Sequence, residues 1–509
     1  MEINKLECNI PSVIKVSEIP CEQSVDTDFT LPDYYPEIDR ILKVMPEANI
    51  LSAQVTDNGV NVGGQVVLTM LYVGNDGQIN SFTHIYPFVK NIEVSDSKDC
   101  FVNVTPRMNY LNTKATAPRK AEVHGSLTLA VVVSKINNCS VLSEIDCEGV
   151  YTKTNEISFS QPLNPIMKSA FVEDEIIIPE GKQTVGKILR SCAKACVSEC
   201  KYVTSKIVIK GDIDIEILYC SPSSNKPVLL TERRGFSQII DCDADCDDIK
   251  FDTVCHIDSL ELHPKTSIDG EVRNIAFTVK VGLDIYPYCI KNLPVITSAF
   301  SGRYLSDIKT VSVAVENVVD SINENYVCKK SLDFSGVLAE VYDLWCTATV
   351  DYASDDGDDI LVKGAVLINI VGANADNEPV LFERTVDYDY RYNVGHSLNG
   401  HRCRPDVSIE AVNYSMNSDG MIEVLAELNI KATVFEIEQV SAVAKISIDE
   451  GTLIKKDTDT AVLLYFAENE TVWSIAEKYG TCPEKICQAN GLESVDSVCN
   501  KTLLIPNIF

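Results

Sequence analysis

The sequence predicts a multidomain, mainly β protein, in which three antiparallel, sandwich-like β repeats precede a small α+β module with the order β-α-α-β. Two observations predict the repeats: one segment occurs three times, and the strands that follow it alternate between apolar and polar residues. A third observation predicts the module, because helical periodicity with capping residues is confined to about the last fifty residues.

The repeats are marked by a recurring segment. Its copies read RILKVMPEANILSAQVTDNGVNVGGQVVLTMLY from Arg40, KILRSCAKACVSECKYVTSKIVIKGDIDIEILY from Lys187 and GVLAEVYDLWCTATVDYASDDGDDILVKGAVLINIVG from Gly336. Three glycines fall in register at steps of 147 and 153 residues, namely Gly64, Gly211 and Gly364. This period is too long for a solenoid unit, so we expect separate or side-by-side domains rather than one stacked array.

Each copy is expected to be an antiparallel β unit. After the glycine of the second copy, four apolar residues alternate with three acidic ones: Ile213, Ile215, Ile217 and Tyr219 against Asp212, Asp214 and Glu216. A period of two is typical of half-buried strands. A second matched strand follows about 60 residues after each glycine, as AEVHGSLTLAVVV, EVRNIAFTVKVGLDI or MIEVLAELNIKATV. We expect β repeats over residues 1–160, 161–310 and 311–445, a linker over 446–459 and the module over 460–509.

Charge and composition exclude several classes of partner. The chain has 44 Lys and Arg against 74 Asp and Glu, a formal net charge of −30. Such a surface repels phosphate backbones and anionic membranes, so we expect no nucleic-acid partner and no membrane insertion. The sequence shows no export signal and no run of 18 apolar residues, so an intracellular protein with its nineteen cysteines reduced is expected.

The C-terminal module begins with an apolar strand over residues 461–466. Thr471 can cap a helix whose apolar face includes Val472, Ile475 and Ala476, and Gly480 suits its end. A second helix is expected to start at Pro483 and to stop at Asn490-Gly491, before a closing strand over residues 503–505.

This order, with the strings TVWSIAEKYGT and ANGL and the ending LLIP, resembles the LysM family over about 50 residues. The resemblance implies that the loops at 467–473 and 490–495 bind N-acetylglucosamine polymers or proteins. The residues it points to are Glu468, Asn469, Glu470, Thr471, Trp473, Asn490, Gly491 and Leu492. The family usually has Gly-Asp-Thr where this chain has Asn469-Glu470-Thr471, which favours a protein over a glycan as the ligand. For Trp473, a core role and an interface role are equally open.

A LysM tail on long acidic β repeats resembles the clostridial spore-coat morphogenetic proteins, whose repeats are called SPOCS domains. In the repeats the resemblance is carried by PEIDRILKVMPEA and VGGQVVLTMLY. It implies a non-catalytic adaptor in the mother-cell cytoplasm, at the forespore surface and in the spore coat. The implied partners are the coat-basement ATPase of sporulation stage IV, bound through LysM, and other coat proteins. The alternative is a protein that binds peptidoglycan or another N-acetylglucosamine polymer.

Residue patterns that could indicate chemistry are weak, and we expect no enzyme, no cofactor and no metal. GKQTVGKI at residues 181–188 imitates a phosphate loop but places Ile188 where a magnesium-binding hydroxyl is needed. Cysteines spaced by four at 192, 196 and 200 and at 242 and 246, and Cys255-His256, do not follow the spacing of zinc sites. The carboxylates at 355–359 lack a calcium-loop pattern. Three cysteines, Cys482, Cys487 and Cys499, are the first candidates for cross-links in the mature spore.

Overall fold

The computed structural model describes residues 4–506 apart from 96, 243–245, 247, 335–336, 396–399, 404, 418–419 and 455–460. Gly336, the first residue of the third copy, and residues 455–459 of the expected linker lie outside the described residues. Strands make up 79% of the structure, and the described part of the chain contains two short helices, both in the C-terminal module. The predicted fold class is confirmed.

The repeats share one order of strands. The first contains β1 (Asn4–Thr30), β2 (Ile38–Thr56), β3 (Gly59–Gly74), β4 (Ile79–Glu93), β5 (Phe101–Ala117) and β6 (Lys120–Asp146). The second contains β7 (Val150–Pro162), β8 (Ile166–Ile177), β9 (Lys187–Val203), β10 (Lys206–Ser221), β11 (Ser224–Asp241), β12 (Ile249–Thr266) and β13 (Val272–Ser301). The third contains β14 (Tyr304–Asp333), β15 (Glu340–Asp356), β16 (Asp359–Ala373), β17 (Pro379–Asn393), β18 (His401–Cys403), β19 (Asp406–Met416) and β20 (Met421–Leu453).

Each repeat is built from two antiparallel sheets. A three-stranded meander, β2-β3-β4, β9-β10-β11 or β15-β16-β17, packs against a second sheet centred on β6, β13 or β20. In the second repeat, β7 and β8 together take the place of β1, and the break between them is flanked by Pro162 and Pro165, which cannot donate to a strand ladder. The isoleucines of the predicted alternation face the core, and Ile213 and Ile217 are fully buried.

The glycines in register are required by an aromatic ring on the next strand. Gly64 is paired with Phe88, Gly211 with Phe236 and Gly364 with Tyr388. In the second repeat, a β-carbon on Gly211 would lie 2.4 Å from the backbone oxygen of Cys196 and 2.5 Å from the Phe236 ring. The ring covers the position that a side chain would occupy, so only glycine fits.

Replacing Gly211 with valine is expected to destabilise the chain by about 1–3 kcal/mol, as is usual for overpacking a well-filled core. Urea unfolding followed by circular dichroism measures the change. Gly181→Val is the matched control, because a β-carbon on Gly181 would meet nothing within 4 Å. Equal midpoints for the two variants would contradict this explanation of the glycine register.

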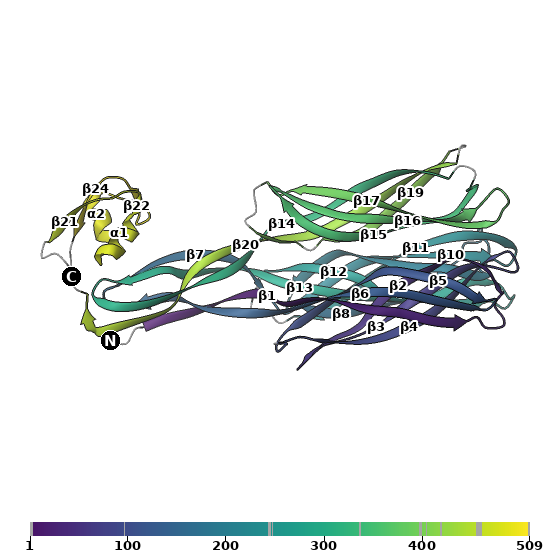
Figure 1. Ribbon diagram of the computed structural model, residues 1–509, viewed down its shortest axis with the longest axis horizontal. Helices are drawn as coiled ribbons and strands as arrows, with labels where there is room; N and C mark the ends of the chain where they lie inside the picture. Colours follow the sequence, from purple (N-terminus) through teal and green to yellow (C-terminus); the bar gives the residue numbers. More distant parts are fainter. Residues whose placement is uncertain are drawn as a thin grey trace.

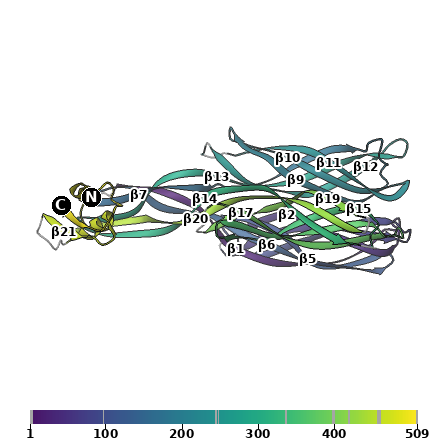
Figure 2. The same ribbon diagram turned by 90° about the horizontal axis from the view of Figure 1, so that it is seen from above.

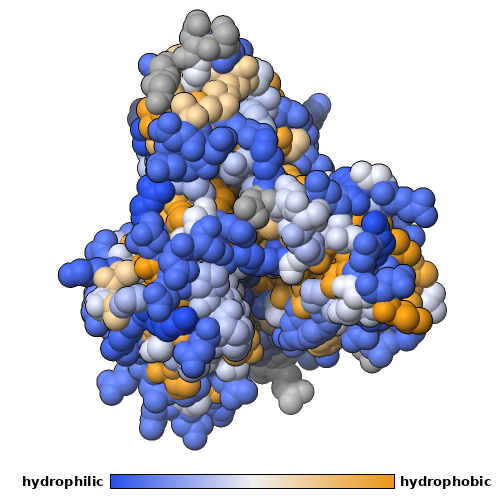
Figure 3. Space-filling model, turned by 90° about the vertical axis from the view of Figure 1, so that its right-hand side faces the viewer, coloured by the Kyte–Doolittle hydropathy of each residue, from blue (hydrophilic) through white to orange (hydrophobic). Residues whose placement is uncertain are grey.

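The three repeats lie side by side around a common axis, which gives the three lobes seen in the end view of Figure 3. Their contacts are cyclic. Arg40 of the first repeat donates to the backbone oxygen of Pro379 in the third, at 2.9 Å. Lys187 of the second donates to that of Ile79 in the first, at 3.3 Å. Lys226 of the second repeat donates to Glu340 of the third, at 2.9 Å.

These contacts join equivalent positions. The steps of 147 and 153 residues that relate the glycines also relate Arg40, Lys187 and Glu340, and they relate Ile79, Lys226 and Pro379. At the centre, a further equivalent set, Leu71, Leu218 and Val371, forms one fully buried cluster. The ring of three repeats is therefore a closed, pseudo-threefold arrangement of one heterologous contact.

The long strands extend beyond the lobes and form a stalk. Figures 1 and 2 show β1, β6, β7, β13, β14 and β20 continuing to the end where both chain termini lie. The stalk has its own core, to which all three repeats contribute, including Val141, Val295 and Ala442. Strand pairing in the stalk extends to Asp146, Ser301 and Leu453. The repeat boundaries expected near 160, 310 and 445 stay predictions.

Candidate functional site

The C-terminal module contains β21 (Val462–Phe466), β22 (Glu470–Thr471), α1 (Val472–Tyr479), α2 (Pro483–Asn490), β23 (Val498–Cys499) and β24 (Thr502–Pro506). The Thr471 hydroxyl accepts a hydrogen bond from the backbone N–H of Ser474, and Gly480 ends α1 in the left-handed region. The predicted order β-α-α-β is confirmed, with one short additional pair, β22 and β23. Val472, Ile475, Ile486 and Leu503 are fully buried in the core of the module.

The module packs against the tip of the stalk, on the second repeat (Figure 1). Trp473 is 7% exposed, and its indole N–H donates to the hydroxyl of Ser298 at 3.0 Å. Phe300 meets the Trp473 ring edge to face, with 5.1 Å between the ring centroids. Lys153 forms an ion pair with Asp496, in the loop after α2. Trp473 therefore belongs to the core of the module and also contacts the second repeat, and a role for it in binding a partner stays a prediction.

The structure brings the two expected binding loops together. The backbone N–H of Trp473 donates to the oxygen of Val495 at 2.9 Å, and that of Asn469 donates to the Asn500 side chain at 2.7 Å. Glu468, Asn469 and Gly491 are exposed.

Other predicted site residues support the module itself. Thr471 caps α1, and Glu470 accepts a hydrogen bond from the Tyr465 hydroxyl at 2.6 Å. The Asn490 amide joins α2 to β24, because it donates to the Ile486 and Leu504 oxygens and accepts from the Leu504 N–H. Leu492 packs against the core. A binding role for any of these residues stays a prediction.

One surface of the module was not identified from the sequence. Val462, Leu464 and Phe466 on β21 and Leu504 on β24 point away from the core and are 42–70% exposed. We call these four residues the outer face. The sequence VLLYF shows no alternation, so only the structure separates the buried side of this strand from the exposed one.

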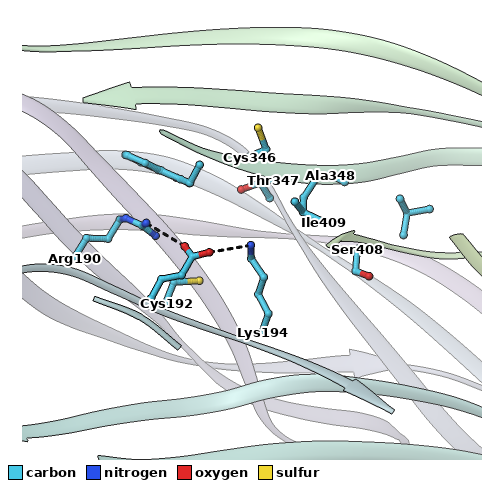
Figure 4. Close-up of a pocket in the computed structure, with 11 residues that line it drawn as sticks. Arg190, Cys192, Lys194, Cys346, Thr347, Ala348, Ser408 and Ile409 are labelled. Atoms are coloured by element: carbon cyan, nitrogen blue, oxygen red, sulfur yellow. Dashed lines mark hydrogen bonds and ion pairs between the residues drawn. The ribbon is translucent and has the colours of Figure 1, made fainter. Parts of the chain in front are cut away.

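The described residues also contain a pocket of about 270 Å³ between the second and third repeats (Figure 4). Its charged groups are paired with one another, because Glu216 forms ion pairs with both Arg190 and Lys194. The same guanidinium donates to Asp343 at 2.7 Å. The arrangement connects repeats and presents no activated nucleophile or acid–base pair to the pocket.

The segments that carry the weak chemical motifs are parts of the β repeats. Residues 181–186 lead into strand β9 rather than a helix, and Lys187 donates to Asn80 of the first repeat, as expected for a segment that is not a phosphate loop. Within the described residues, no three potential ligands are grouped to hold a metal. Burial raises the pKa of the Cys200 and Cys255 thiols to about 12, which disfavours the reactive thiolate.

Comparisons with known proteins agree with the two resemblances. The profile described as the SPOCS domain of the SipL family matches residues 37–116 and 184–279, in the first and second repeats. The LysM domain profile matches residues 467–506. No curated protein and no solved structure matches the chain. In the part of the chain that the structure describes, no helix is long and apolar enough to span a membrane.

Proposed function

Because the chain joins SPOCS domains of the SipL family to a C-terminal LysM domain, we propose that it is a non-catalytic adaptor of spore-coat assembly that binds the coat-basement ATPase of stage IV. The matched domains support a sporulation coat-associated protein with a LysM binding module. The proposal adds the partner, the forespore surface in the mother cell as the location, and contacts with further coat proteins.

The observation that carries the proposal is the apolar outer face of LysM, at the free end of the stalk (Figure 1). Large exposed side chains gathered on one small sheet are typical of a surface that binds protein. The closed ring of repeats supports a scaffold that holds this module away from the lobes. No constellation among the described residues suggests a reaction.

Binding of an N-acetylglucosamine polymer remains the second candidate, since the LysM fold itself favours it. Two features count against it. The loop carries Asn469-Glu470 in place of the family's Gly-Asp, and Trp473, beside the same loop, is covered by the stalk. A protein ligand on the outer face needs neither the Gly-Asp pair nor an exposed Trp473.

Leu464→Glu in the full chain is expected to weaken binding of the purified ATPase by at least about tenfold, because a buried apolar anchor is replaced by a charge. The variant should unfold at the same urea concentration as the parent, since Leu464 is 70% exposed. Affinity is measured by surface plasmon resonance, in parallel with N-acetylglucosamine hexamer.

Val89→Glu is the matched control. Val89 lies on a strand of the first repeat and is 69% exposed, so the same change of charge occurs at equal exposure but far from LysM. Full affinity of Leu464→Glu for the ATPase would exclude the outer face as its site. Hexamer binding without any ATPase binding by the parent would favour the glycan alternative. A uniform cytosolic signal from a fluorescent fusion during sporulation would count against the proposed location.

A further inference from the structure

We infer that the contact between LysM and the stalk is a releasable latch, which closes over one side of the expected binding loops and opens when a ligand takes that side. We define the latch as Ser298, Phe300 and Lys153 of the second repeat with Trp473 and Asp496 of LysM. The inference rests on the proposed function only in taking LysM as the binding module.

The closed state is built around the indole of Trp473. Its N–H has a specific acceptor in the Ser298 hydroxyl, and its ring lies against Phe300, which in turn contacts Tyr151 with 5.2 Å between centroids. An indole that is 7% exposed and hydrogen-bonded cannot also stack on a ligand. The closed latch therefore removes this side chain from the binding surface.

The backbones also meet closely at the latch. A β-carbon on Gly302 would lie 2.8 Å from the backbone oxygen of Gly480, at the end of α1. Gly302 has no left-handed backbone conformation, so a larger residue there is not strained by its own φ angle, and its side chain meets the LysM backbone at Gly480 and the ring of Tyr151 on β7. This position offers a way to open the latch without changing LysM.

The contact is small enough to open. Besides the close approach of Gly302 to Gly480, its described contacts include one aromatic cluster, the side-chain hydrogen bond from Trp473 to Ser298 and one ion pair. The side chains of that ion pair are 27% and 54% exposed, and such a pair contributes little in salt. LysM keeps a core of its own when undocked, because Val472, Ile475, Ile486 and Leu503 pack within the module. Since both partners belong to one chain, redocking is intramolecular and the closed state persists at any protein concentration.

The latch divides LysM into two surfaces. The outer face is free in the closed state, whereas the side of the loops that carries Trp473 and Asp496 becomes available only in the open state. A ligand of the covered side binds only the open state, so its apparent affinity is the intrinsic affinity multiplied by the fraction of molecules that are open. A latch that is open one-tenth of the time therefore lowers the apparent affinity about tenfold.

The test compares Gly302→Leu with Gly181→Leu in the full chain. Gly181 lies outside the latch, and a β-carbon there would meet nothing within 4 Å. The first readout is quenching of tryptophan fluorescence by iodide; the chain has two tryptophans, and Trp345 lies in the ring of repeats, away from the substitution. We expect stronger quenching in Gly302→Leu than in the parent, and no increase over the parent in Gly181→Leu. The second readout is binding of the ATPase and of N-acetylglucosamine hexamer, and affinity for the one that occupies the covered side should increase several-fold in Gly302→Leu.

A second pair of variants does not depend on a steric wedge. Lys153→Asp should increase quenching, and combining it with Asp496→Lys should restore the parent value by reforming the ion pair in reverse. Unchanged quenching in both Gly302→Leu and Lys153→Asp would overturn the latch. Increased quenching with no gain for hexamer or for the ATPase would show that the covered side binds neither, and would overturn the gating role. Failure of the ATPase to bind any variant refutes the proposed function but leaves the quenching result to decide the latch.

Discussion

Arg190→Met is expected to lower the free energy of unfolding by about 3–5 kcal/mol, because it leaves Asp343 buried without its counter-ion. The Arg190 and Asp343 side chains are 5% and 1% exposed, and the guanidinium makes two hydrogen bonds to one carboxylate oxygen, at 2.7 and 3.0 Å. Trp345 stacks on the guanidinium with 4.5 Å to the ring centroid.

The carboxylate depends strongly on this one arginine. Burial raises the pKa of Asp343, since the attraction of Arg190 offsets only part of the desolvation. Its other oxygen, Oδ1, has no hydrogen-bond partner among the described residues. Removing Arg190 therefore exposes the full cost of burying the group.

Urea unfolding of three variants measures the effect. Arg233→Met is the matched control, because Arg233 pairs with Asp214 at the surface, where an ion pair contributes little to stability, so its unfolding midpoint should stay close to that of the parent. The double variant Arg190→Met with Asp343→Leu should recover most of the loss, because it replaces the pair by apolar side chains. A double variant as unstable as Arg190→Met would show that the pair itself, rather than the orphaned charge, stabilises the ring.

Trp473→Ala is expected to lower the free energy of unfolding of LysM by about 3–5 kcal/mol, because it removes a buried aromatic side chain from a module of about fifty residues. Hydrogen exchange should rise throughout 462–506 while the repeats, which have cores of their own, keep their protection. Trp473→Phe is the milder comparison, since it keeps much of the packing and loses the hydrogen bond to Ser298, worth about 1 kcal/mol.

Binding of the ATPase must be measured beside hydrogen exchange. If Trp473→Ala keeps LysM protected and no longer binds, Trp473 is an interface hot spot. If the module loses protection, Trp473 acts through stability, and the loop at Glu468, Asn469 and Glu470 becomes the next region to test. A protected variant that binds at full affinity would place the contact elsewhere, with the outer face as the first candidate.

Local features of the fold could be predicted from the sequence because they depend on neighbouring residues. The alternation at Ile213 and Ile215, the cap at Thr471 and the helix end at Gly480 all follow from period and backbone preference. The stalk strands could not be predicted. Pro11 and Pro20 argue against a strand, yet both lie in β1, an edge strand where a missing donor can be tolerated.

The candidate site was predicted in its location but not in its composition. The two loops were identified from the LysM resemblance, whereas the outer face was hidden by the uniformly apolar VLLYF. Trp473 could not be assigned because its environment includes Ser298 and Phe300, about 175 residues away in the chain. Long-range contacts of this kind leave no local pattern to detect.

The cyclic contact between repeats also fixes how many repeats the body can hold. Each repeat carries two different contact surfaces, and in the ring of three every surface is paired with that of a neighbouring repeat. No contact surface stays free to add a further repeat, so the ring is closed. A chain with one repeat deleted would present one surface of each kind, and its copies would associate head to tail until a ring closed or a fibre formed. Three repeats thus keep this acidic rod from polymerising through its own interface, and any ordered array of it must be organised by surfaces outside the ring.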